Sequence, residues 1–260
     1  MIIQNAAVFH EDGYFENRDL YFENGIFMKS VSQNTERLDA TGLYAVPGLT
    51  DIHFHGCSGV DFCDGTSQAF QKIADYQAEN GITTMIPASM TLKKDELHRI
   101  YASASDFQSE KGAILAGINM EGPFLSKKKK GAQKESNIVE ADSGTFEELQ
   151  KASGGLIKFV SLAPEEKNAM TFIRQVKDQV TVSLAHTDAD YQTAVQAFEA
   201  GATHVTHLFN AMPPFHHRNP GVVGAAMDHA RYVELICDGV HLHPSVVRAA
   251  FKCFGEDRIV

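Results

Sequence analysis

Histidine is the residue type that stands out in this 260-residue chain, which contains twelve histidines and no tryptophan. One histidine alone is more often an ordinary surface or core residue, but several of these fall where strands are expected to end, together with one acid. The residues of this group are His53, His55, Glu121, His186, His207 and His241. Borderline divalent metals such as zinc favour imidazole and carboxylate ligands, and such a set with an open position is typical of a catalytic ion. The pattern therefore predicts a catalytic metal centre.

The pair His53 and His55 adds a second argument, because a spacing of two residues in a strand places both imidazoles on the same face. The remaining histidines lack a strand-end placement, apart from His243, which stays open between the two readings. His204 is one position off the register of the His207 strand end, and we expect it to be structural. The metal prediction thus concerns the strand ends and not histidine content as such.

The elements that must position these residues alternate between strand and helix from residue 50 onward. We expect strands at 50–55, 83–88, 113–120, 156–162, 180–185, 203–206 and 232–237, and helices at 66–80, 93–108, 145–152, 165–177, 189–200 and 244–254. Helices that stop at glycine just before the next strand, as at Gly81 and Gly201, are typical of αβ loops. The alternation predicts a parallel sheet, whose strands present catalytic residues at their carboxyl ends.

Seven such units, with an eighth strand starting at 258–260, predict an α/β fold of the (β/α)8 TIM-type barrel class, truncated near the eighth strand. Residues 47–260 are fewer than the ~250 residues of a typical complete barrel. The alternative is an open doubly wound sheet, which needs no eighth strand. The missing glycine-rich dinucleotide fingerprint after the first strand counts against that alternative.

Residues 1–46 read as a small β domain, a portion of a β-sandwich, that precedes the barrel of residues 47–260. Its clearest piece is residues 20–31, where apolar runs flank Asn24-Gly25. Asn-Gly supplies the positive φ angles of a type I′ turn, so we expect a β-hairpin there.

The net charge and the composition exclude some classes of binding partner. A formal charge of −10 argues against nucleic acid. The one basic run, 127–130, is expected to be a solvated loop that can also raise the local positive potential for an anionic substrate. We see no apolar stretch of ~20 residues and no signal peptide at the N-terminus, so no membrane segment is expected. Four cysteines without a CxxC pair are read as reduced thiols, which predicts a cytoplasmic protein.

Several motifs together resemble a known family. Residues 46–56 (VPGLTDIHFHG) resemble the first-strand signature of the amidohydrolase superfamily. The motifs EGPF at 121–124, HLFNAM at 207–212 and DGVH at 238–241 look like the N-acetylglucosamine-6-phosphate deacetylase family. Many superfamily members instead use a carboxylated lysine on the fourth strand, but Lys158 lies near the wrong end of that strand. The resemblance implies metal-dependent hydrolysis of the acetamide of N-acetylglucosamine 6-phosphate, yielding glucosamine 6-phosphate and acetate.

The resemblance also implies roles for individual residues. Glu121, His186 and His207 match the family's principal metal ligands, while His53 and His55 match the extra pair of members able to hold a second ion. One or two divalent ions are therefore expected, zinc first, with iron, manganese or cobalt as the alternatives. The family's general acid/base is an aspartate at the end of the eighth strand, which by register falls just beyond Val260. The catalytic residue is therefore left unassigned.

Substrate contacts follow from the same resemblance. Asn210 and Ala211 match contacts to the sugar phosphate, Ala132 a position in the substrate loop, and His241 a histidine near the acetamide. Arg218 matches an arginine that reaches the phosphate in a neighbouring subunit, which implies a homodimer. Gln133 stands where some members carry histidine.

Two alternatives stay open. The first is another amidohydrolase, such as a deaminase or a cyclic-amide hydrolase, against which Glu121 and Asn210-Ala211 count. The second is a catalytically dead fragment that binds metal or sugar phosphate, which the absent aspartate favours.

Overall fold

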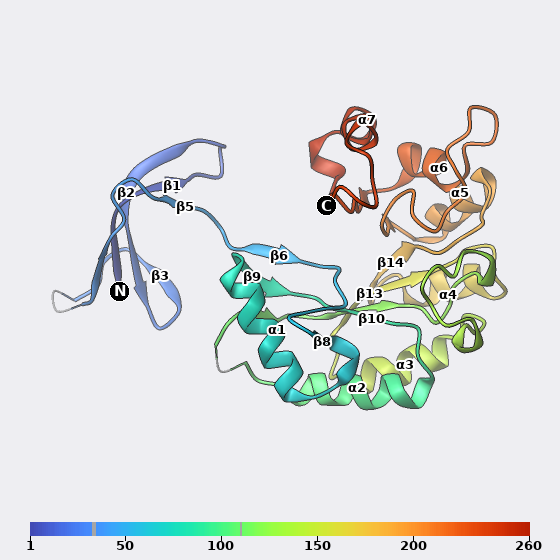
Figure 1. Cartoon of the computed structure of the whole chain (residues 1–260), viewed down its shortest axis with the longest axis horizontal. Coiled ribbons are helices and arrows are strands. Elements are labelled where there is room, and N and C mark those ends of the chain that lie inside the picture. Colours follow the sequence, from blue (N-terminus) through green and yellow to red (C-terminus); the bar gives the residue numbers. More distant parts are fainter. Residues whose placement is uncertain (33–34, 110) are drawn as a thin grey trace. The chain divides into compact units, whose positions relative to one another are not determined.

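The computed structural model describes residues 1–32, 35–109 and 111–260. The chain divides into two compact units, Met1–Leu49 and Thr50–Val260. Many of the elements of each unit are labelled in Figure 1. None of the helices in the described part of the chain is both long and apolar enough to cross a membrane.

The first unit is a small sheet built around strand β1 (Ile2–Phe9). β1 pairs antiparallel with β2 (Phe15–Glu23), and β2 pairs with β3 (Ile26–Met28), while β4 (Arg37–Asp39) and β5 (Tyr44–Ala45) run parallel to β1. The expected hairpin is confirmed: Glu23 pairs with Ile26 across Asn24 and Gly25, whose φ angles are 52° and 76°. Ala6, Val8 and Ala40 form the core of this unit.

The parallel strands of the second unit form two sheets, and within each sheet the strands pair in chain order. One sheet contains β6 (Leu49–Asp51), β9 (Ile82–Met85) and β11 (Ile114–Leu115). The other runs in the order β10 (Ala88–Ser89), β12 (Ile118–Glu121), β13 (Ile157–Leu162), β14 (Thr181–Leu184), β15 (His204–Val205) and β16 (Tyr232–Val233). A parallel bridge between Val233 and Ile259 lies where the eighth strand was expected. A doubly wound sheet would reverse its strand order part-way, so the consecutive order favours the barrel.

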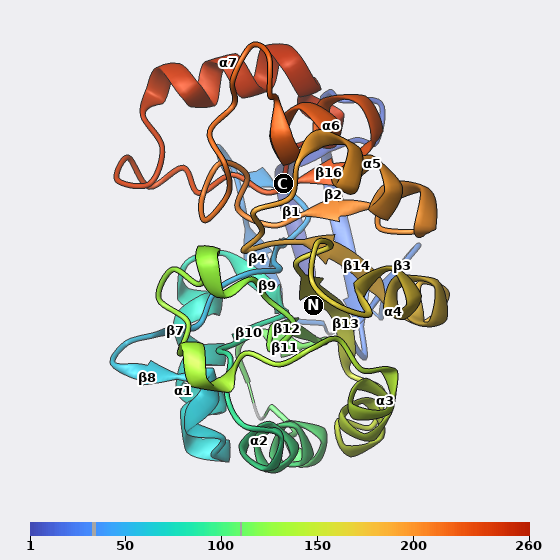
Figure 2. The ribbon, with the colours of Figure 1, turned by 90° about the vertical axis from the view of Figure 1, so that its right-hand side faces the viewer.

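Helices follow the strands and lie outside them in Figure 2. They are α1 (Ser67–Glu79), α2 (Lys94–Asp106), α3 (Ser143–Ala152), α4 (Ala169–Val176), α5 (Tyr191–Ala200), α6 (Gly221–His229) and α7 (Pro244–Phe254). A short antiparallel pair, β7 (Gly56–Cys57) and β8 (Val60–Asp61), precedes α1. The predicted helices are confirmed within a few residues at each end.

Several elements differ from the sequence-based expectation. The strands expected at 83–88 and 113–120 are each divided, into β9 and β10 and into β11 and β12, and the strand expected at 232–237 is assigned over Tyr232–Val233. The first strand ends at Asp51 instead of residue 55, although the Ala88 N–H still donates to the Phe54 carbonyl and continues the pairing. Helix α6 was not expected. Residues 221–226 are all buried and apolar, and the exposed Asp228 and His229 stand only at the end of the helix, so the segment lacks the amphipathic period by which surface helices are recognised.

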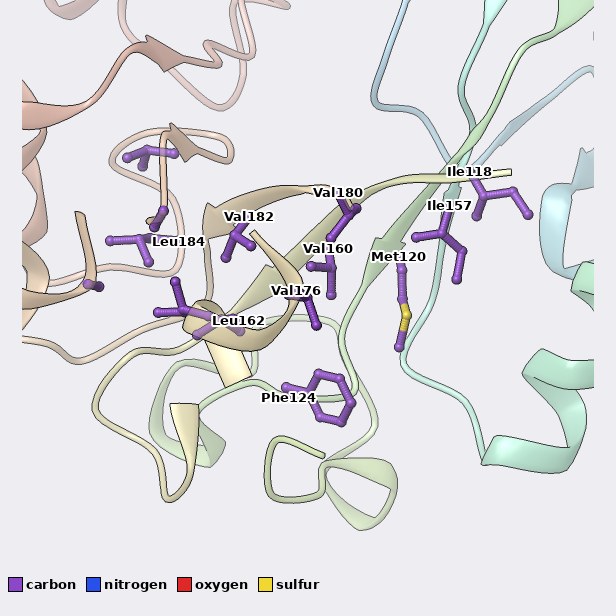
Figure 3. Packing of buried hydrophobic residues seen from close by; sticks show 14 of the residues in the cluster. Ile118, Met120, Phe124, Ile157, Val160, Leu162, Val176, Val180, Val182 and Leu184 are labelled. Carbon is purple, nitrogen blue, oxygen red and sulfur yellow. The ribbon is translucent and has the colours of Figure 1, made fainter. Parts of the chain in front are cut away.

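The core of the second unit lies between the strands and the helices. Figure 3 shows side chains of β12, β13 and β14 packed together, including Met120, Val160, Leu162 and Val182. All four residues of β12 are buried, as is typical of strands in a parallel sheet that is covered on both faces. The last of them, Glu121, is charged, and this places a carboxylate at the buried end of a core strand.

Gly122 follows Glu121 with a φ of +84°, and a Cβ there would overlap Thr91 Oγ1. Gly155 has a similar φ of +86°, but no described atom lies within 4 Å of its Cβ position. We expect Gly155→Ala to lower the free energy of unfolding by about 1–2 kcal/mol through backbone strain. Gly122→Ala should cost roughly 1–3 kcal/mol more, because Thr91 must move as well. Urea denaturation of both variants measures the difference, and equal losses would contradict the close packing of Gly122 against Thr91.

Candidate metal centre

The carboxylate of Glu121 is the point on which four imidazoles converge. Glu121 Oε1 lies 3.0 Å from His207 Nε2, 3.2 Å from His186 Nε2 and 3.6 Å from His53 Nε2. Glu121 Oε2 lies 3.2 Å from His55 Nε2. Only 2% of Glu121 is exposed, so this is a buried carboxylate with four imidazole nitrogens around it.

Parallel strands bring these residues together at one edge. Glu121 ends β12, His186 lies two residues after β14, and His207 two residues after β15. His53 and His55 follow β6 and point at the same carboxylate, as their spacing predicted. His186 and His207 have φ angles of 44° and 31°, a region that non-glycine residues seldom adopt. Strained backbone of this kind concentrates at functional sites.

The other ring nitrogen of three imidazoles is already occupied. His186 Nδ1 lies 2.9 Å from the Lys129 carbonyl, and His55 Nδ1 lies 3.1 Å from the Ala88 carbonyl. A carbonyl can only accept, so both rings carry their proton on Nδ1 and, when neutral, direct an Nε2 lone pair at Glu121. His53 Nδ1 lies 2.6 Å from Glu234 Oε2. This arrangement is how metal-ligating histidines are usually held.

The donor atoms fit a divalent cation. They form two groups, His53/His55/Glu121 and Glu121/His186/His207, and within each group the ligand atoms lie within 4.8 Å of one another. His186 Nε2 and His207 Nε2 are 3.2 Å apart. Lone pairs this close to one another and to a carboxylate repel, and a cation between them removes the repulsion. Glu121 belongs to both groups and can therefore bridge two ions.

Two buried carboxylates, those of Glu121 and Glu234, lie among the imidazoles, and these contacts shift the pKa values of the centre. Burial alone would raise the pKa of Glu121, but the hydrogen bonds that His186, His207 and His55 donate to it when their rings carry both protons hold it well below its usual value. Burial opposes ionisation of Glu234 too, yet bonds from His204 and His53 lower its pKa to about 2. Burial alone would lower the pKa of His53. The hydrogen bond and the negative charge of Glu234 outweigh burial and raise the pKa of His53 to about 9. Both acids are therefore ionised at neutral pH.

Two residues of this centre make contacts that the sequence analysis did not predict: the contact of Gln133 was left open, and Glu234 was not considered. Gln133 donates from Nε2 to Glu121 Oε2 at 2.8 Å and accepts the Thr91 N–H at 2.7 Å. Glu234 accepts hydrogen bonds from His53 and from the buried His204. The Nε2 atom of His204 lies 2.9 Å from Glu234 Oε1. The available signal for Glu234 was an acid inside the apolar run 232–237, where a charge needs a buried partner.

The loop that carries Ala132 lies beside the centre. A Cβ built on the preceding residue, Gly131, would be 3.3 Å from His186 Cε1 and 4.0 Å from Ala211 Cβ. The Ala211 carbonyl accepts the Thr187 N–H at 3.1 Å, and Asn210 Nδ2 donates to the Leu208 carbonyl. Gly131, the residue before Ala132, and Ala211 therefore lie beside His186.

The solvated-loop expectation for residues 127–130 is wrong for Lys129. Its carbonyl holds His186, and its ammonium lies 3.6 Å from Asp188 Oδ1, while that of Lys128 lies 3.4 Å from Asp188 Oδ2. The loop is therefore part of the support of the centre. The loop supports His186 through a backbone carbonyl, and such a contact cannot be predicted from the side chains of the loop.

Arg218 and His241 lie outside the convergence on Glu121. Arg218 is exposed, and its backbone N–H donates to His216 Nδ1. His241 is also exposed, with Nδ1 2.7 Å from Asp238 Oδ2. Backbone N–H groups of His241 and Val240 lower the pKa of Asp238 to about 2. His241 belongs to neither ligand group.

Comparison with known proteins agrees with this geometry. A sequence model described as the amidohydrolase family matches residues 44–259. The chain belongs to the amidohydrolase family. It is 40% identical over 222 residues to N-acetylglucosamine-6-phosphate deacetylase of Bacillus subtilis, covering 83% of this chain and 56% of that protein. It is 34% identical over 268 residues to the enzyme of the same name from Lysinibacillus sphaericus, covering 100% of this chain and 69% of that one.

Solved structures give the same fold. The N-acetyl-D-glucosamine-6-phosphate deacetylase of Mycobacterium smegmatis, in a mutant complex with N-acetyl-D-glucosamine-6-phosphate, matches with a TM-score of 0.85 and 26% identity. The match covers 100% of this chain and 69% of that one. The expected barrel class and family resemblance are confirmed, and this amidohydrolase chain spans about 56–69% of the length of these relatives.

Zinc should stabilise the folded protein through this centre. Free zinc at about 100 times its Kd adds ~2.7 kcal/mol to the free energy of unfolding, provided that the unfolded chain does not bind it. We expect an increase of several degrees in the Tm of the native protein and a much smaller one in His186→Ala. His98→Ala, which changes an exposed histidine on α2, is the control and should respond like the native protein. Equal shifts in the native protein and His186→Ala, measured by scanning calorimetry, would contradict the assignment.

Proposed function

We propose that the protein carrying this chain is an N-acetylglucosamine-6-phosphate deacetylase. It hydrolyses the acetamide of N-acetylglucosamine 6-phosphate to glucosamine 6-phosphate and acetate. The observation that carries the proposal is the buried Glu121 carboxylate shared by four imidazoles. These five residues belong to a chain of the amidohydrolase family, and two of its relatives are named N-acetylglucosamine-6-phosphate deacetylase.

The chemistry needs a cation at this carboxylate. A bound divalent ion supplies an electrophile for the amide carbonyl and lowers the pKa of water toward ~7. Glu121, His186 and His207 would hold it, and His53 and His55 with Glu121 would hold a second ion. Gln133 keeps the Glu121 carboxylate in one orientation, since its amide is itself fixed by Thr91.

Zinc is the ion that we assign, because four imidazoles and one carboxylate form a borderline donor set. Iron, manganese and cobalt accept the same ligands and are the other outcomes of a metal analysis. The four cysteines, all within the described part of the chain, are unpaired. This suits a reducing compartment, and we place the protein in the cytoplasm.

Substrate recognition is assigned to the loops around His186. Ala132, Asn210 and Ala211 would contact the sugar phosphate, and His241, positioned by Asp238, would contact the acetamide side. The Arg218 guanidinium forms no ion pair with any described residue, and guanidinium matches phosphate well. We propose that it reaches the phosphate in the partner subunit of a homodimer.

Proton transfer is the step that the described residues do not supply. The carboxylates that contact the four imidazoles are Glu121 and Glu234, and both are already occupied by imidazole hydrogen bonds. We assign the general acid/base to the aspartate that the family resemblance implies at the end of the eighth strand, just beyond Val260. The same observation favours a second candidate function for the 260 residues alone, binding of metal and sugar phosphate without turnover.

Deacetylation by the protein that carries these residues should depend on metal. We expect acetate release from N-acetylglucosamine 6-phosphate by the zinc-loaded protein, loss of that activity after chelation, and recovery when zinc is restored. His186→Ala should reduce kcat/KM at least ~100-fold, because ligand loss removes transition-state stabilisation of this order. Equal turnover by the metal-stripped protein would refute the proposal.

The same assay separates the alternatives. Substrate binding by calorimetry without acetate release from the 260-residue chain would support the second candidate. Hydrolysis of a cyclic amide or deamination of a nucleobase, with no release of acetate, would identify another amidohydrolase.

Arg218→Ala should raise the KM for the phosphorylated sugar. A charged hydrogen bond contributes ~1.5–3 kcal/mol, so the expected increase is roughly 10–100-fold with a smaller change in kcat. Arg174→Ala removes an exposed arginine from α4 and serves as the control. Steady-state kinetics with an unchanged KM in Arg218→Ala would contradict the phosphate contact.

A further inference from the structure

Glu234 lies directly after β16 and connects three parts of the centre. Its Oε2 is 2.6 Å from His53 Nδ1 and 3.3 Å from the His207 backbone nitrogen, which donates to it. Its Oε1 is 2.9 Å from His204 Nε2. Only 6% of Glu234 is exposed, so a buried charge is kept ionised by three donors. Such a charge is costly unless fully paired.

The support of His53 differs from that of the neighbouring rings. The Nδ1 atoms of His186 and His55 are held by the backbone carbonyls of Lys129 and Ala88. His53 Nδ1 is held by a side chain, and its contact is the shortest of the three. A carboxylate on the far nitrogen fixes the ring orientation and makes the near nitrogen a stronger ligand.

We propose that Glu234 is a positioning residue that holds His53 Nδ1 and directs His53 Nε2 toward Glu121, and thereby controls occupancy of the His53/His55/Glu121 half of the centre. The effect is selective for this half. Among the ligands of the other half that the structure describes, the Glu234 side chain contacts His207 through its backbone nitrogen, at 3.3 Å. The inference rests on the proposed metal centre but is tested separately from it.

His204 has the complementary role. It lies on the far side of the Glu234 carboxylate from His53, is 2% exposed, and packs against Phe159 and Tyr232. Its bond stabilises the buried charge without touching the metal ligands. Removing His204 therefore destabilises the fold while leaving the bond between Glu234 and His53 in place.

The test is calorimetric titration of zinc into the metal-free protein, with the Tm of each variant measured in parallel. We expect the native protein to bind two ions. Glu234→Met has a side chain of similar length and no carboxylate, and it should weaken the second ion ~10–100-fold. The first ion should stay within about threefold of native. Glu234→Gln should lie between the two, because its carboxamide oxygen still accepts the His53 Nδ1–H.

Two controls separate positioning from stability. His204→Phe should lower the Tm and leave the Kd of the second ion within about threefold of native. Glu199→Met, an exposed site on α5, should behave as native.

The inference would be overturned if both Glu234 variants bound the second ion with native affinity. It would also be overturned if His204→Phe weakened the second ion as much as the Glu234 variants do, or if the native protein bound one ion. Should Glu234→Met fail to fold, the comparison of Glu234→Gln with His204→Phe decides between the two roles. A native protein that binds no zinc refutes the proposed centre itself, which is a different result.

Discussion

The buried carboxylate of Glu121 is the constraint on which the remainder of the site depends. A carboxylate this deep in a parallel sheet is tolerated only if its neighbours compensate the charge, and here the neighbours are four imidazoles. Each imidazole comes from the end of a different strand or from the segment that follows the first one. The parallel arrangement of the strands brings these ends to one edge.

Around this carboxylate the protein builds a second layer that orients the ligands. Backbone carbonyls of Lys129 and Ala88 and the side chain of Glu234 occupy the far ring nitrogens, so that the near nitrogens are directed inward. Gln133 restrains the carboxylate itself. Half of this layer is backbone, and those two contacts are insensitive to side-chain substitution. Glu234 and Gln133 are the positions at which a single side chain changes the geometry of the centre.

The sequence predicted the parts that depend on local pattern. Asn24-Gly25 predicted its turn from the φ angles that these residues adopt, and the spacing of His53 and His55 predicted a shared face even though the assigned strand is shorter. The histidines at strand ends were found because burial and periodicity mark the strands. Helix α6 was missed because an all-buried segment has no polar face to set its period.

What the sequence could not reveal depends on partners far apart in the chain. The role of Glu234 could not be predicted because its partner His53 lies 181 residues away in the sequence, and only the fold brings the two together. The support that Lys129 gives His186 passes through a carbonyl, which every residue type possesses. The roles of Arg218 and His241 came from family resemblance alone, and their exposed positions leave those roles as proposals.

The central claim is that one buried carboxylate organises the metal centre. Anomalous diffraction at the zinc edge, from crystals of zinc-loaded protein, tests it most directly. The account predicts density in contact with Glu121 and bounded by the four imidazoles, with His186 and His207 on one ion and His53 and His55 on the other. Zinc bound elsewhere, with the four rings still hydrogen-bonded to a metal-free Glu121, would contradict it.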